Sequence, residues 1–216
     1  MTPIQRVRIA DVVGEPHTWN PRSASTNEPF PYIDISSIDA AEKSIRGAVQ
    51  ILPRDAPSRA RQLVERNDVL VSTVRPNLNA VAIVPDQLDG ATASTGFSVL
   101  RPDRERIEAR YLYHWVQGQE FIRYLTSRAT GASYPAVTER VVRESRMPLP
   151  SLAEQRRIAG MLDMGDAIRC KRRESLRLLD EFLRSAYASI VGPGNPSYRQ
   201  WPEQELADLT SRRDDA

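Results

Sequence analysis

Residues 147–162, MPLPSLAEQRRIAGML, mark the entry into a long helix. The two prolines of this stretch favour extended backbone before the helix begins. Ser151 and Glu154 then fit an S-x-x-E capping box, in which each side chain accepts a hydrogen bond from the backbone N–H of the other residue. No proline interrupts the chain from there to Gly192. The pattern predicts one helix from Ser151 to about Ile190, about 60 Å long at a rise of about 1.5 Å per residue.

An apolar row runs along this predicted helix. The basic stretch Arg169–Arg173 interrupts the row in its middle, and Gly160 and Gly165 weaken the helix enough to allow a bend. A solvated surface helix is the alternative, but it would not need so long a row, so we expect packing against another helix. The residues expected to pack are Ile158, Leu162, Ile168, Leu176, Leu179, Leu183, Ala186 and Ile190, with Met161 in the same row.

The preceding 150 residues alternate short β-branched segments with loops rich in Pro, Asn, Ser and Thr. This pattern is typical of an α+β fold, a mixed α/β domain with a short-stranded sheet. The expected strands are Val7 to Val13, Tyr32 to Ile35, Val69 to Val74, Ala80 to Val84 and Phe97 to Leu100. The expected helices are Tyr111 to Val116, Phe121 to Leu125 and Val137 to Val142. We therefore divide the chain into a domain at 1–150, a long helix at 151–191 and a linker from 192 onward.

Composition excludes several classes of protein. A chain of 216 residues with 40% hydrophobic content supports one core of roughly 150 residues plus an extension. No run approaches the roughly 18 apolar residues of a membrane helix, and the N-terminus lacks a signal peptide, so we expect a cytoplasmic protein. The single cysteine, Cys170, excludes an internal disulfide. Of the basic residues 28 are arginine and two are lysine, which suits bidentate contacts to phosphate or guanine, although a GC-rich genome gives the same bias.

Residues that catalyse reactions are scarce. His17 and His114 have no Ser or Cys partner in sequence, and we expect His17 to be exposed and His114 to pack in an aromatic-rich helix face. The chain holds no H-E-x-x-H metal motif, no Glu-x-Lys nuclease motif, no G-x-x-x-x-G-K-[ST] phosphate loop and no G-x-G-x-x-G. The Pro-Pro-aromatic tetrapeptide of amino-methyltransferases is also missing. We therefore expect a binding protein without catalytic residues, metal ligands or a cofactor of its own.

The end of the chain repeats a pattern from its beginning. Residues 205–209, ELADL, follow the pattern of residues 8–12, RIADV, and Trp201-Pro202 precedes the second copy. We expect the first strand of a second copy of the N-terminal domain here. Chance similarity over five positions is the alternative.

Several motifs occur in a fixed order along the chain. The strongest is MPLPSLAEQRRIA at residues 147–159, continued by Leu162-Asp163 and the basic Lys171-Arg172-Arg173. Weaker motifs precede it: YIDIS at 32–36, NDVLVSTVRP at 67–76, STGFSVL at 94–100 and TGAS at 130–133. Together they cover nearly the whole chain, which resembles the specificity (S) subunit of type I restriction-modification systems.

The resemblance implies a non-catalytic DNA-recognition subunit. In that family two target-recognition domains each read half of a split DNA site, and two long helices, packed as an antiparallel pair, join them. This chain would be either the N-terminal half of a longer subunit or a half-subunit that forms a homodimer through its helix. The expected partners are double-stranded DNA, an adenine-specific methyltransferase subunit and a restriction/translocase subunit, and those subunits would hold S-adenosylmethionine, ATP and Mg.

The resemblance also places particular loops near DNA. The residues expected there are Arg75, Asn77, Asn79, Ser94, Thr95, Gly131, Ser133, Tyr134 and Arg140. Ordinary turn chemistry is the alternative for each of them. Two other functions remain open: the recognition tail of a fused restriction-methylation enzyme, and a helix-mediated scaffold that never touches DNA.

Overall fold

The computed structural model describes residues 5–25, 27–192, 195, 197 and 200. The chain divides into two compact units, Met1–Leu162 and Asp163–Ala216. The first unit is a mixed α/β domain of small sheets, and the long helix α4 (Leu152–Val191) begins within it. The expected fold class, a short-stranded α+β domain followed by a long helix, is confirmed. Among the described residues, no helix is both long enough and apolar enough to span a membrane.

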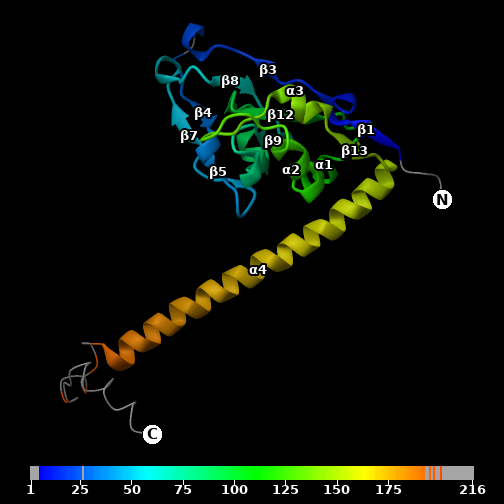
Figure 1. Cartoon of the computed structure of the whole chain (residues 1–216). Coiled ribbons are helices and arrows are strands. Elements are labelled where there is room, and N and C mark those ends of the chain that lie inside the picture. The colour runs from blue at the N-terminus through cyan, green and yellow to red at the C-terminus, as the bar shows by residue number, and fades with distance from the viewer. Residues whose placement is uncertain (1–4, 26, 193–194, 196, 198–199, 201–216) are drawn as a thin grey trace. The chain divides into compact units, whose positions relative to one another are not determined.

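Short strands form two larger sheets and two small ones (Figure 1). The first sheet has the strand order β10-β9-β12-β2, the second β3-β8-β11-β4-β7, and the small ones are β1-β13 and β5-β6. β11 runs parallel to β4, whereas the other pairs of neighbours are antiparallel. The strands are β1 (Arg6–Arg8), β2 (Val13–Gly14), β3 (His17–Thr18), β4 (Phe30–Ile33), β5 (Ile38–Asp39), β6 (Ser44–Ile45), β7 (Val49–Ile51), β8 (Ala60–Leu63), β9 (Val69–Ser72), β10 (Val81–Ile83), β11 (Thr92–Ser94), β12 (Phe97–Pro102) and β13 (Arg146–Pro148).

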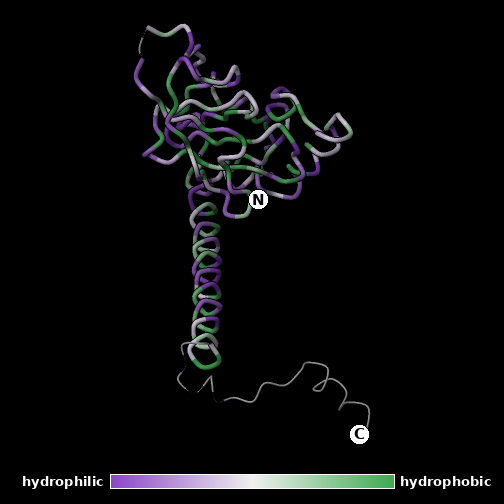
Figure 2. The backbone as a smooth tube through the Cα atoms, turned by 90° about the vertical axis from the view of Figure 1, so that its left-hand side faces the viewer, coloured by the Kyte–Doolittle hydropathy of each residue, from purple (hydrophilic) through white to green (hydrophobic). Residues whose placement is uncertain are grey.

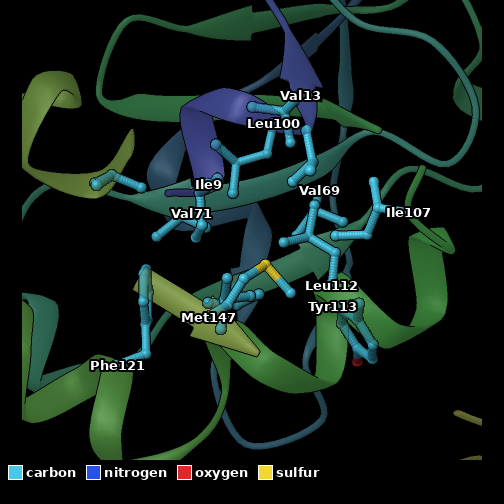
Figure 3. Close-up of a cluster of buried hydrophobic side chains, with 14 of the residues drawn as sticks. Ile9, Val13, Val69, Val71, Leu100, Ile107, Leu112, Tyr113, Phe121 and Met147 are labelled. Atoms are coloured by element: carbon cyan, nitrogen blue, oxygen red, sulfur yellow. The ribbon is translucent and has the colours of Figure 1, made fainter. Parts of the chain in front are cut away.

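The first sheet is apolar on both faces because each face covers a different core. Val69 and Val71 of β9 belong to one core, which we call the first core. Leu70, which lies between them, belongs to the second core. This alternation follows from the two-residue period of a strand. Figure 3 shows the first core, where side chains of the sheet meet Leu112 from a helix and Met147 from β13. A continuous apolar run is therefore the sequence signature of this doubly covered strand.

Two amphipathic helices line the first core, α1 (Ala109–Val116) and α2 (Gln119–Thr126). Each buries apolar side chains four residues apart, so one face of each helix meets the core. These side chains are Leu112 and Val116 in α1, and Phe121 and Leu125 in α2. Both helices were predicted from this spacing, and both are confirmed with bounds shifted by two residues or fewer.

A buried amide fixes the start of α4. Gln155 is fully buried, and its Oε1 accepts a hydrogen bond from the backbone N–H of Glu108 at 2.8 Å. Its Nε2 donates to the carbonyl oxygens of Arg106 at 3.1 Å and Pro150 at 2.9 Å. Ala159, one turn later, is buried in the first core. The first turns of α4 are therefore part of the domain.

The predicted long helix is confirmed, with one change at its cap. The backbone N–H of Glu154 donates to Ser151 Oγ at 3.4 Å, which is half of the expected capping box. The carboxylate of Glu154 binds Arg157 at 2.6 Å. α4 runs unbroken through Gly160 and Gly165.

Several expected segments have other bounds in the structure; the expected strand Val69 to Val74, for example, ends at Ser72. The expected strand Val7 to Val13 is broken by a short 3-10 turn at Ile9–Asp11, because the Asp11 carboxylate accepts a hydrogen bond from the N–H of Arg8 at 3.0 Å. A second turn, Ile35–Ser37, takes Ile35 out of β4. α3 (Glu139–Glu144) begins two residues later than expected, since Thr138 is its N-cap and accepts from the N–H of Val141. The expected second-domain start at Trp201 lies outside the described residues.

Candidate nucleic-acid interface

Three loops far apart in sequence meet on one surface of the domain. Residues 73–79, 94–96 and 130–138 form it, and we call it the three-loop surface. The N–H of Thr73 donates to Gly96 O at 2.9 Å, and the N–H of Val137 donates to Thr73 O at 2.9 Å. A further bond runs from the N–H of Arg75 to Pro135 O at 2.7 Å. The fold thus brings together the three loops that the sequence motifs singled out.

The loop 75–79 is fixed at both ends by unusual backbone. Arg75 and Asn79 both lie in the left-handed region, with φ of 49° and 47°, on either side of the turn η5 (Pro76–Leu78). Asn79 Nδ2 donates to Gln117 O at 3.3 Å, and Lys43 Nζ donates to Asn79 O. Partial burial lowers the pKa of the Lys43 amine. Because neighbouring elements hold this loop, its exposed tip at Asn77 keeps a defined position.

Loop 130–138 carries an exposed aromatic ring. Tyr134 is 69% exposed, and the guanidinium carbon of Arg75 lies 4.4 Å from the centre of its ring. Gly131 makes the loop possible, since its φ of 102° is in the range that favours glycine and a Cβ there would come within 3.0 Å of Tyr134 O. Ser133 is exposed beside it. The guanidinium of Arg75 and the ring of Tyr134 therefore form a side-chain contact between two of the three loops.

Ser94 does not face solvent, which corrects one expected DNA contact. Its side chain is fully buried, and its Oγ accepts a hydrogen bond from the N–H of Gly96 at 3.2 Å. Thr95 next to it is exposed, and its N–H donates to Arg59 O at 2.8 Å. Arg59 was missed by sequence reasoning, because only this pairing of β11 with β8 places it beside the surface. A pocket of about 360 Å³, lined in part by Thr73, Thr95 and Thr138, opens at the same place.

The arginines of the domain differ in what neutralises them. Arg140, expected at the DNA surface, is highly exposed but binds Glu144 at 2.7 Å within α3. Within the described part of the chain, Arg59 and Arg75 have no carboxylate within ion-pair distance. Unneutralised arginines attract phosphate and offer free donors to bases. The three-loop surface thus carries one arginine without a carboxylate partner among the described residues, several hydroxyls and an exposed aromatic ring.

A larger polar pocket, of about 560 Å³, lies beside a buried ion pair. It is lined by Asp68 and Arg101 among others. Asp68 is 1% exposed and pairs with Arg101 at 2.9 Å, which joins the start of β9 to the end of β12. Burial raises the pKa of the Asp68 carboxyl. The charge partner of this carboxylate is therefore already in place within the fold.

The structure places the helix-packing residues in two environments. Ile158 packs against the first core of the domain. Of the other helix-packing residues, Leu162, Ile168, Leu176, Leu179, Leu183 and Ile190 are exposed and Ala186 is half-buried. The predicted row therefore begins as part of the domain core and continues as a surface.

A family model described as "Type I restriction modification DNA specificity domain" matches residues 19–178. The chain belongs to this family. Membership confirms the assignment to the type I specificity subunits, which recognise DNA and are not catalytic. The "Type I restriction enzyme HindI specificity subunit" of Haemophilus influenzae is 22% identical over 111 residues, covering 50% of this chain and 24% of that protein.

Solved structures agree with this assignment. The HsdS subunit from Thermoanaerobacter tengcongensis is 35% identical, with 90% of this chain and 52% of that chain covered and a TM-score of 0.71. A chain from a structure described as the basis of complex assembly and conformational transition of the type I R-M system matches at 35% identity over the same shares, with a TM-score of 0.72. The S subunit from M. genitalium, at 13% identity and a TM-score of 0.54, shares the fold alone. This chain spans about half the length of these solved subunits.

Proposed function

We propose that this chain reads one half of a split DNA site with its three-loop surface and sets the distance to a second reading domain through α4. One observation carries the proposal: the part of α4 after Leu162 has a row of large exposed apolar side chains. Their exposed fractions are 68% for Ile168, 53% for Leu176, 51% for Leu179, 55% for Leu183 and 59% for Ile190. Burying apolar surface gains roughly 25 cal/mol per Å², so a row of this length favours a partner.

The spacing of the row suits a second helix. From Leu176 through Ala186 to Ile190 the apolar positions are three, four, three and four residues apart, which is the seam of a helix pair. Apolar and polar residues alternate along α4 in Figure 2. The partner helix belongs either to a second copy of this chain, in a two-fold arrangement, or to the second half of a longer subunit. Either arrangement provides two reading domains at a fixed separation.

A second group of exposed apolar side chains on α4 favours contact with a further partner. Met164, Leu178 and Phe182 are exposed by 62%, 51% and 65%. At about 100° per residue they lie roughly 80° to 120° around the helix from the centre of the row, so the two groups together form a wider apolar arc than the seam of one helix pair. Sequence reasoning did not include them in the row. We propose that an adenine-specific methyltransferase subunit docks on this group.

The remaining components of the reaction would belong to the partners. S-adenosylmethionine would bind to the methyltransferase subunit, and ATP and Mg to a restriction/translocase subunit that joins through it. The chain itself would supply DNA recognition and the docking surface, in the cytoplasm where bacterial DNA lies.

The apolar row can be tested by substitution within the helix. Leu176→Asp or Leu183→Asp places a charge in the seam, and burying an unpaired charge is strongly unfavourable. If two copies pair, light scattering of the full chain should give about twice 24.3 kDa for the wild type and a single-chain mass for the variants.

Ser185→Asp is the matched control. It adds the same charge to an exposed position on the opposite side of α4, roughly 180° from Leu176, and should leave the mass unchanged. A wild-type chain that stays single would assign the row to the second half of a longer subunit, in which case Leu183→Asp must lower the thermal stability of that subunit. A pairing mass unaffected by both row variants would contradict the helix interface.

A further inference from the structure

Among the described residues of the three-loop surface, Tyr134 is the one exposed aromatic ring that contacts a guanidinium. That guanidinium belongs to Arg75. We propose that Arg75, oriented by Tyr134, reads a guanine in the half-site and is the specificity-determining side chain of this surface. The inference rests on the proposed function and deepens it, since it names the base and the residue that reads it.

The backbone of Arg75 is held in place before any DNA arrives. Its φ of 49° is a left-handed conformation that a non-glycine residue adopts only when its surroundings impose it. Here the N–H of Arg75 donates to Pro135 O at 2.7 Å, and Val74 forms a β-bridge with Ala136. Two loops thus fix the point from which the side chain leaves. Such prior ordering reduces the entropy lost on binding.

The stack also fixes the direction of the guanidinium. Its carbon lies 4.4 Å from the centre of the Tyr134 ring, well within the roughly 6 Å of a cation–π contact. A guanidinium that stacks on a ring in this way uses its face for the contact and keeps the N–H groups of its edge available. No carboxylate of the described chain pairs with Arg75, so those donors have no competing acceptor of that kind.

An oriented guanidinium edge matches guanine better than it matches phosphate. Guanine presents O6 and N7 side by side in the major groove, and a bidentate arginine satisfies both. A phosphate contact needs only a positive charge within reach, which lysine supplies equally well. Arg140 differs from Arg75, because its guanidinium is already paired with Glu144. The two arginines should therefore respond differently to replacement by lysine.

The test selects bound sequences from a random duplex library, using the full chain with a type I methyltransferase subunit. The wild type should select a motif with a guanine at a defined position. Arg75→Lys should reduce the preference for that guanine by roughly tenfold, the equivalent of one bidentate contact, and leave the other positions unchanged. The slope of log affinity against log salt should also stay unchanged, because the charge is kept.

Arg140→Lys is the matched control and should alter neither the motif nor the salt slope. Tyr134→Phe should keep the guanine preference, and Tyr134→Ala should weaken it, because only the alanine variant removes the ring. A thermal melt shows that each variant is folded. A motif without guanine, or one that Arg75→Lys and Tyr134→Ala both leave intact, overturns this inference alone. If the wild type selects no sequence at all, the proposed function itself fails.

Discussion

At the scale of single residues, arginine has three separate roles in this chain. Arg101 is structural and neutralises the buried Asp68. Arg157 stabilises the first turns of α4 by pairing with Glu154. Arg75 has no carboxylate partner among the described residues and stacks on Tyr134. A count of arginines could not separate these roles, because the acidic partner decides each of them.

Asp68→Asn should destabilise the domain while leaving DNA preference unchanged. The substitution removes one partner of a buried ion pair and leaves Arg101, whose side chain is 18% exposed, with only the half-exposed Glu65 at 2.9 Å as its counter-charge. Because Glu65 remains, the expected loss in the free energy of unfolding lies below the roughly 3 kcal/mol of a buried pair whose charge is left uncompensated. Urea unfolding of the full chain measures this loss, with the exposed Asp86→Asn as control. An unfolding midpoint equal to that of the control would show that the pair does not hold β9 to β12.

Sequence reasoning selected three loops that the fold brings together, but not which side chains within them are exposed. Asn77, Thr95, Ser133 and Tyr134 are exposed as a DNA contact requires, whereas Ser94 is buried. The motif STGFSVL does not show which of its hydroxyls points outward. That depends on β11 being covered on the side of Ser94, a long-range feature without a local signal.

At the scale of elements, a helix was predicted correctly where its apolar spacing repeats over successive turns. A strand was predicted correctly where it contains a continuous apolar run. α4, α1 and β9 are examples, since their apolar spacing is sufficient to assign them. β3, β5 and β6 were missed, because a two-residue strand has no measurable period. The strands β7, β8, β11 and β13, of three or four residues each, were missed as well. The Ile9–Asp11 turn was missed because a single side chain, Asp11, caps it.

Gln155 is the element-scale feature that deserves a direct test. Replacing it with leucine leaves the N–H of Glu108 and the carbonyls of Arg106 and Pro150, which are partly buried, without their partner. The expected loss in the free energy of unfolding is roughly 3 kcal/mol, from the desolvation cost of such groups. Urea denaturation measures it, and the exposed Gln119→Leu should change stability by less than about 0.5 kcal/mol. Equal midpoints for the two variants would mean that Gln155 does not anchor α4.

At the scale of the whole molecule, the chain has features suited to two different interfaces. The three-loop surface carries Arg75 and several hydroxyls, side chains of the kinds that contact DNA. The described part of α4 has an apolar row with the spacing of a helix pair. A scaffold protein would need only the second of these, and the tail of a fused enzyme would need only the first. Both features are present in this one chain, which belongs to a family of specificity subunits. This combination favours a subunit that reads DNA and also sets the position of a second reading domain.

The central claim is that this chain directs modification to one half of a split DNA sequence. Mapping methylated adenines in DNA from cells with and without the gene tests it most directly. We predict a motif of two short defined parts separated by a fixed number of unspecified base pairs, present with the wild-type gene and lost with the deletion or with Leu183→Asp. Methylation that is unchanged by the deletion, or that follows one continuous motif, would contradict the account.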